Sequence, residues 1–127
     1  GWRWPLHESL FAPLLAAGVP VLGGNAPQAL VRRVAREGES AWPEDLAAVA
    51  RAAGPLAGAG LAALDADLIE GHCGHLPPAR LPAMRAAQAV RDASMWQALV
   101  DAPGRRKVLV AGNGHVRRDY GVPRFAG

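Results

Sequence analysis

The spacing of apolar side chains predicts several helices along the chain. Apolar residues recur every three or four positions over 80–100, the period of one helix face, which predicts a long helix there. These residues are Leu81, Met84, Met95 and Leu99. Shorter segments with suitable start and stop residues predict helices over 6–17, 28–36 and 43–53. The segment 61–69 fits either a short helix or a linker.

Two short apolar runs, 19–23 and 106–111, predict buried strands, and Pro20 favours the edge or the start of the first one. Helices between short apolar strands are typical of the α/β class, so we expect a layered, parallel-type sheet with flanking helices. Two strands are few for such a sheet. We therefore expect an incomplete sheet in a single domain over 1–127 that lacks its N-terminal half.

The composition limits the classes of function. A chain of 127 residues with 50% hydrophobic and 20% charged residues is expected to fold as one domain. The net charge is +3, and the scattered cations form no stripe with aromatic residues, which argues against nucleic-acid binding. Proline and glycine break the uncharged stretch 9–31, so no transmembrane segment is expected. Cys73 is the only cysteine, which excludes an internal disulfide framework.

Polar side chains follow both predicted strands. Asn25 comes after the first strand, and Asn113 and His115 lie in the glycine-rich turn after the second. Ligands of open α/β sheets bind outside the carboxyl ends of parallel strands, so these three side chains are expected at one edge if the strands are parallel. A tight turn with an exposed histidine is the alternative. We favour a functional His115, because the flanking glycines let the backbone approach a ligand.

Another set of donors lies in one loop bounded by glycines and prolines. His72, Cys73 and His75 carry two imidazoles and a thiol, which are ligands suited to zinc, copper or haem iron. The alternative is a polar loop whose histidines cap the following helix.

Tyr120 is the only tyrosine of the chain. A phenolate stabilised by Arg117 or Arg118 could ligate ferric haem, since tyrosine is a known axial ligand. Ordinary packing of the ring is the alternative.

Polar residues also interrupt the long predicted helix. Gln88, Arg91 and Asp92 lie on neighbouring turns and form either the wall of a site or a solvated edge. Met84 and Met95 are expected in the core rather than as ligands.

Three ordered segments together resemble the ChaN-like haem-binding family, whose members are iron-regulated bacterial lipoproteins within the Tiki-related superfamily. The segments are residues 4–13 with 18–21 and 24–25; CGHLP at 73–77 with 84, 87–88 and 91–95; and VLVAGNGHVR at 108–117 with 121–123. They cover nearly the whole chain and correspond to the family's C-terminal half.

The resemblance implies an α/β fold, haem bound at the subunit interface of a homodimer, and a role in iron acquisition with outer-membrane uptake components. It also implies a periplasmic or outer-membrane-associated location. Family members use a tyrosine as haem ligand with help from histidine. The haem-binding candidates here are Tyr120, His115, His75, His72, Arg117, Arg118 and Asn113.

We therefore expect a haem-binding protein of bacterial iron or haem uptake, and a binding protein rather than an enzyme. The alternative is a metal-dependent hydrolase of the Tiki-related type, in which the histidine of the GNGH sequence at 112–115 binds the metal or acts as a base. The cofactor would then be zinc, with His115, His75 and Cys73 as metal donors. A third reading is a stable module whose conspicuous residues only pack or bind a partner.

Overall fold

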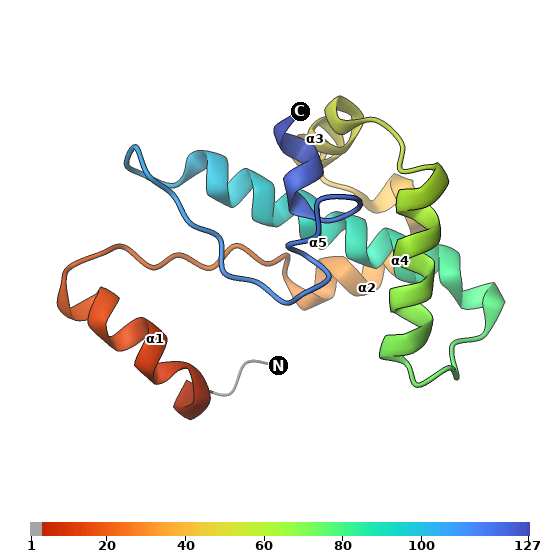
Figure 1. Ribbon diagram of the computed structural model, residues 1–127. Helices are drawn as coiled ribbons and strands as arrows, with labels where there is room; N and C mark the ends of the chain where they lie inside the picture. Colours follow the sequence, from red (N-terminus) through yellow and green to blue (C-terminus); the bar gives the residue numbers. More distant parts are fainter. Residues whose placement is uncertain (1–3) are drawn as a thin grey trace.

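A computed structural model describes residues 4–127, which form five α-helices and three short 3-10 helices (Figure 1). The elements are α1 (Trp4–Ala16), α2 (Gln28–Glu37), η1 (Gly38–Ala41), α3 (Glu44–Ala53), α4 (Gly58–Gly71), η2 (Pro78–Arg80), α5 (Leu81–Asp101) and η3 (Val122–Ala126). The predicted α/β class is wrong, because these residues contain no strand and therefore no sheet.

The two predicted strands are the source of this error. The run 19–23 follows α1 and the run 106–111 follows α5, and both lack helical structure. In the described part of the molecule no backbone hydrogen bond joins the two runs to each other. Val108 is 85% exposed, and Val21 and Leu22 are also exposed, although a buried strand was expected at both places. A local preference for extended backbone makes a strand only when a neighbouring strand takes up its N–H and C=O groups.

The predicted helices are confirmed, and α5 forms the centre of the body. Its buried face carries Val90 and Ala93, neither of which is exposed, and α2 packs against it through Val31 and Val34. The aromatic ring of Phe125 in η3 stacks on Trp96 of α5 with 6.5 Å between ring centroids. Figure 1 shows α2, α3 and η3 gathered around α5.

Helix α4 settles the open choice between a helix and a linker over 61–69. It is fixed to α5 by the guanidinium of Arg85, which donates to the carboxylate of Asp65 at 2.6 Å. Its first turn is tightly packed, since a Cβ on Gly60 would lie 2.6 Å from the carbonyl oxygen of Asp119. The glycine is therefore needed where α4 meets the loop that precedes η3.

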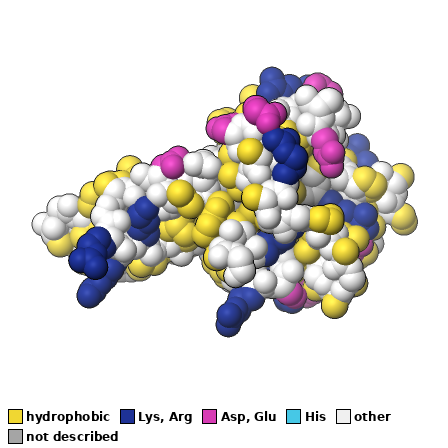
Figure 2. All heavy atoms as spheres, turned by 90° about the horizontal axis from the view of Figure 1, so that it is seen from above, with side chains coloured by type: hydrophobic (Ala, Val, Ile, Leu, Met, Phe, Trp, Pro, Cys, Tyr) yellow, Lys and Arg dark blue, Asp and Glu magenta, His cyan; other side chains and the backbone are white. Residues whose placement is uncertain are grey.

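Helix α1 and the extended run after it project from the body, as Figures 1 and 2 show. Leu6, Leu10 and Leu15 are exposed on α1. In Figure 2 the projecting part of the molecule carries scattered hydrophobic side chains, with Lys and Arg side chains at its end. Among the helices described, none is long and apolar enough to cross a membrane.

Candidate functional site

The loop of residues 112–121, called here the histidine loop, is closed by its own backbone. The N–H of His115 donates to the carbonyl of Gly112 at 2.9 Å, and the N–H of Gly121 donates to that of Arg117 at 2.9 Å. The N–H of Val122 donates to the carbonyl of His115 at 2.8 Å. These bonds fix the backbone that carries the His115 side chain.

His115 meets α5 at two polar residues one turn apart. Its Nδ1 lies 2.5 Å from Oδ1 of Asp92 and 2.9 Å from Nε2 of Gln88. The side chain of Asp92 is 3% exposed and that of His115 is 19% exposed. In the described part of the chain no hydrogen bond reaches the other ring nitrogen, Nε2. The imidazole is thus bonded at Nδ1, and its Nε2 is left to donate a proton or an electron pair to a ligand.

Burial raises the pKa of Asp92, because a carboxylate loses hydration inside the protein. Hydrogen bonds from His115 and Gln88 and the charge of Arg124 oppose this effect. Asp92 is the only charged residue in the buried part of the described chain. Its neighbours therefore have to supply the interactions that water supplies at the surface.

Tyr120 lies in the same loop but has a different environment. Its ring is 2% exposed, and its hydroxyl donates a hydrogen bond to the carboxylate of Asp67 on α4. The guanidinium of Arg117 lies 4.9 Å from the centre of the ring. Burial and the bond to Asp67 raise the pKa of the phenol, and Arg117 only partly offsets them. The structure thus favours the neutral phenol over the phenolate that ligates iron.

The structure brings His115 and Tyr120 close to one point, the turn at Gly114. A Cβ on Gly114 would lie 3.5 Å from the hydroxyl oxygen of Tyr120 and 3.8 Å from Nε2 of Gln88, which itself contacts His115. Arg117 is engaged by Asp119 at 2.6 Å and by Asp67 at 3.5 Å.

The other two candidates of the histidine loop lie at its surface. Asn113 and Arg118 are both exposed.

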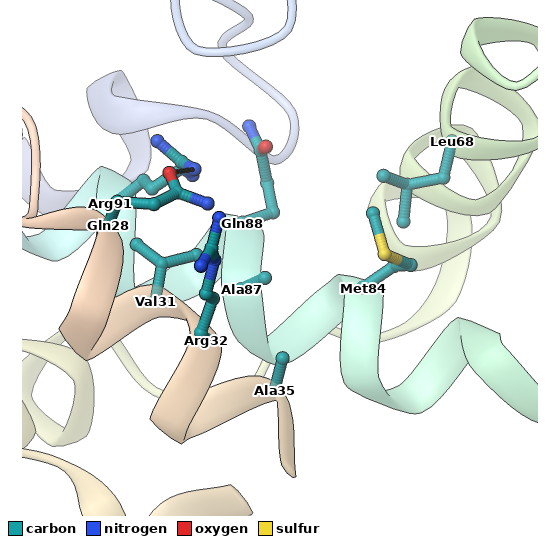
Figure 3. Close-up of a pocket in the computed structure, with 9 residues that line it drawn as sticks. All are labelled: Gln28, Val31, Arg32, Ala35, Leu68, Met84, Ala87, Gln88 and Arg91. Atoms are coloured by element: carbon teal, nitrogen blue, oxygen red, sulfur yellow. Dashed lines mark hydrogen bonds between the residues drawn. The ribbon is translucent and has the colours of Figure 1, made fainter.

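A groove lies between α2, α4 and α5 beside Gln88 (Figure 3). Its volume is about 230 Å³, and Val31, Leu68 and Met84 supply apolar lining. Two guanidinium groups, of Arg32 and Arg91, lie along it. An apolar surface with cations at its border suits a flat apolar ligand that carries carboxylates.

A larger cavity of about 370 Å³ opens on the other side of Gln88. Trp42, Tyr120 and Phe125 contribute to its lining, as does Asp92. Gln88 therefore borders both cavities and touches the His115 imidazole.

Asn25 and His115 contact adjacent residues of α5, although the sheet edge that was predicted to bring them together does not form. Oδ1 of Asn25 accepts a hydrogen bond from Arg91 at 3.1 Å, and His115 reaches Asp92. Gly24 packs so closely on α5 that an added Cβ would lie 3.3 Å from Cβ of Ala98. The convergence is made by packing on a helix and not by the predicted sheet edge.

His72, Cys73 and His75 are exposed in the loop between α4 and η2. Nδ1 of His72 lies 2.7 Å from the carbonyl oxygen of Leu68, so this histidine caps the end of α4, the helix before it. Across residues 4–127 no three His, Cys, Asp or Glu side chains come together in a group that could hold a metal ion. The zinc donors expected at Cys73, His75 and His115 are thus not assembled in this arrangement.

The sequence pattern does not indicate the hydrogen-bond partners of His115 and Tyr120. Asp92 and Gln88 belong to the polar stripe of the long helix, and both contact the imidazole of His115. Their spacing of four residues on an apolar helix was the available signal. Nothing in the sequence pointed to Asp67 as the partner of Tyr120.

A comparison with models of protein families identifies the family of the chain. The model of the family described as "Haem-binding uptake, Tiki superfamily, ChaN" matches residues 1–125. The chain belongs to this family. No curated protein and no solved structure gives a significant match. Membership in this haem-binding family supports a role in haem binding in general.

Proposed function

We propose that this member of the ChaN family binds haem in a bacterial haem or iron uptake system, with His115 as the iron ligand. The observation that carries the proposal is the contact between the imidazole of His115 and the carboxylate of Asp92. A buried carboxylate holds Nδ1 at 2.5 Å, and Nε2 takes part in no hydrogen bond within residues 4–127. Histidines that ligate metals are commonly held in this way by a carboxylate on their second ring nitrogen.

The groove beside Gln88 would hold haem as a partly exposed ligand. His115 does not line this groove and reaches it only through its contact with Gln88, so the iron would lie outside the groove. The groove beside Gln88 offers apolar lining from Val31 and Met84, and Arg32 and Arg91 would hold the propionates. Its volume of about 230 Å³ is below that of a pocket enclosing a drug-sized ligand, so the groove would cover only part of the macrocycle. Haem supplies an iron centre that accepts an axial imidazole or phenolate.

Two observations favour His115 over Tyr120 as the iron ligand. The phenol of Tyr120 donates to Asp67, and both that bond and burial oppose its ionisation. Ligation by Tyr120 would require this bond to break and the proton to leave. His115 needs neither change, because its Nε2 is not committed to another described group.

The partly open groove also fits the homodimer that we propose, in which a second subunit covers the rest of the haem. We propose a periplasmic or outer-membrane-associated location and exchange of haem with outer-membrane uptake components. The location and the exchange with uptake components follow from the family resemblance alone, and the open groove bears only on the second subunit.

Titration of the purified chain with hemin tests the proposal. We expect a shifted Soret band in the unaltered chain and at least tenfold weaker binding in His115→Ala. His75→Ala is the matched control, since it removes an exposed imidazole outside the histidine loop and should leave affinity unchanged. Absence of a Soret shift in the unaltered chain refutes haem binding. Equal affinity of the chain and His115→Ala refutes His115 as the ligand.

A further inference from the structure

Asp92 occupies a position that packing alone does not explain. It lies in the middle of α5 with 2% of its surface exposed, next to Ala93 and two residues after Val90, neither of which is exposed. An apolar side chain at such a position avoids the cost of removing a carboxylate from water, and replacing buried ionic groups by apolar ones is often neutral or stabilising. The carboxylate of Asp92 is therefore expected to orient the imidazole of His115, which it contacts.

The contact with His115 restricts where the imidazole proton can be. An ionised carboxylate only accepts hydrogen bonds, so a ring nitrogen 2.5 Å from Oδ1 of Asp92 must carry a proton. Nε2 of Gln88, which can only donate, lies 2.9 Å from the same Nδ1 and also bonds to the Asp92 carboxylate. Two donors cannot bond to each other, so a proton on Nδ1 requires the amide of Gln88 to direct its hydrogens at the carboxylate. In that arrangement the Asp92 carboxylate accepts from both the imidazole and the amide.

The backbone that carries the imidazole is held by the loop, so the ring can leave this contact only by rotating its own side chain. The histidine loop holds His115 through its N–H and through its C=O, at 2.9 and 2.8 Å. Gly121 is packed so that three carbonyl oxygens of the loop surround the position of a Cβ. A ring attached to a fixed backbone and bonded at Nδ1 has one orientation.

We infer that Asp92 is a positioning residue, which holds the His115 imidazole as the tautomer protonated on Nδ1 and so presents an unprotonated Nε2 as an electron-pair donor. The use of that electron pair to bind haem iron rests on the proposed function. The tautomer itself does not, because it belongs to the chain without ligand.

The opposite arrangement is chemically possible and gives the test its second outcome. A protonated Asp92 would donate its proton to Nδ1 of His115, and Nε2 would then carry the ring proton. An imidazole in that state has no electron pair at Nε2 for a metal. The two arrangements share the same heavy-atom distance, so they have to be separated by spectroscopy.

Nitrogen NMR of the ¹⁵N-labelled chain without ligand separates them. Long-range ¹H–¹⁵N correlation at about pH 8, above the ordinary pKa of a free imidazole, shows which ring nitrogen is protonated. The chain has four histidines, and the signals lost in His115→Gln identify the relevant ring. We expect a protonated Nδ1 and an unprotonated Nε2. A protonated Nε2 in the unaltered chain overturns the inference, whether or not any variant folds.

Asp92→Asn tests the cause of the preference. The amide can donate as well as accept, so we expect His115 to become a mixture of tautomers or to reverse. Asp101→Asn is the matched control, because it removes an exposed carboxylate from the same helix, where Asp101 accepts from Gln97. A single Nδ1-protonated tautomer in a folded Asp92→Asn chain overturns the inference.

Hemin titration of the same variants links the tautomer to binding. Loss of a carboxylate behind a metal-ligating histidine typically weakens binding 10- to 100-fold, and we expect a loss of this size for Asp92→Asn and none for Asp101→Asn. If the unaltered chain binds no hemin but has the Nδ1-protonated tautomer, the proposed function fails and the positioning role stands. If hemin binds while the tautomer is the opposite one, the positioning role fails and haem binding stands.

Discussion

Replacement of Gly121 by alanine tests whether the closed histidine loop is required for the site. A Cβ at this position would lie 2.5 Å from the carbonyl oxygen of His115, 2.7 Å from that of Arg117 and 2.8 Å from that of Gly114. All three are backbone atoms, which cannot move aside as a flexible side chain can. The φ of Gly121 is −84°, so the effect is steric and not a consequence of an unusual backbone conformation.

The expected loss of stability follows from these contacts. Overpacking typically costs about 1–3 kcal/mol. Opening the loop also weakens the bonds donated by the N–H groups of Gly121 and Val122, at about 0.5–1.5 kcal/mol each. We expect a total of about 2–6 kcal/mol. With an unfolding entropy of roughly 2.1 cal/mol/K per residue, this lowers the Tm of a chain of this length by about 7–22 °C.

Urea and thermal unfolding, followed by circular dichroism, measure this loss. Gly23→Ala is the control, because a Cβ there has no atom within 4 Å. We expect its stability to stay within about 0.5 kcal/mol of the original, as for most surface substitutions. A Gly121→Ala chain as stable as Gly23→Ala would refute the tight packing of the loop described above.

Three further predictions concern ionisation and charge. The single tyrosine, Tyr120, should ionise above its ordinary pKa of 10.0, because burial and the bond to Asp67 raise the pKa of its phenol. Titration of the phenolate absorbance at alkaline pH measures this pKa. A midpoint at or below 10.0 would contradict the buried environment of the ring. The hydrogen bond from Arg117 lowers the pKa of Asp119 below 3.8, so its stabilising effect is present above pH 3.8 and is lost as the pH falls through the lower folded-state value. The difference in Tm between the original chain and Arg117→Gln should therefore shrink on acidification below pH 3.8, and a constant difference would argue against this pair. Arg91→Gln should weaken hemin binding but leave binding of haem dimethyl ester unchanged, and equal losses for the two ligands would show that Arg91 does not hold a propionate.

The helices of this chain could be predicted because their evidence is local. The apolar period over 80–100 predicts the extent of α5 at Leu81–Asp101, although Met95 is the only one of its four residues that is buried. The helix over 43–53 corresponds to α3 at Glu44–Ala53. The same kind of local evidence wrongly predicted two strands and a sheet. The runs 19–23 and 106–111 have the composition of strands, but pairing depends on what lies beside them in space, and neither run supplies a partner for the other.

The candidate site was predictable in part for a similar reason. The glycine-rich turn marked His115, and the resemblance to a haem-binding family drew attention to Tyr120. The roles of these two rings depend on carboxylates that come from α5 and α4, 23 and 53 residues away in sequence. No local pattern indicates that Asp92 faces an imidazole or that Asp67 accepts a hydrogen bond from a phenol. Both contacts need the packed helices.

The projecting lobe has a consequence for handling the isolated chain. The accessible surface is 8425 Å², whereas a compact protein of 13.2 kDa exposes roughly 6,400 Å². Much of the lobe is aliphatic, with leucines of α1 and valines of the two extended runs facing water. The tendency of the chain to self-associate will therefore be governed by these exposed side chains rather than by the groove beside Gln88. Mild detergent, more than added ligand, is the additive that should keep concentrated samples dispersed.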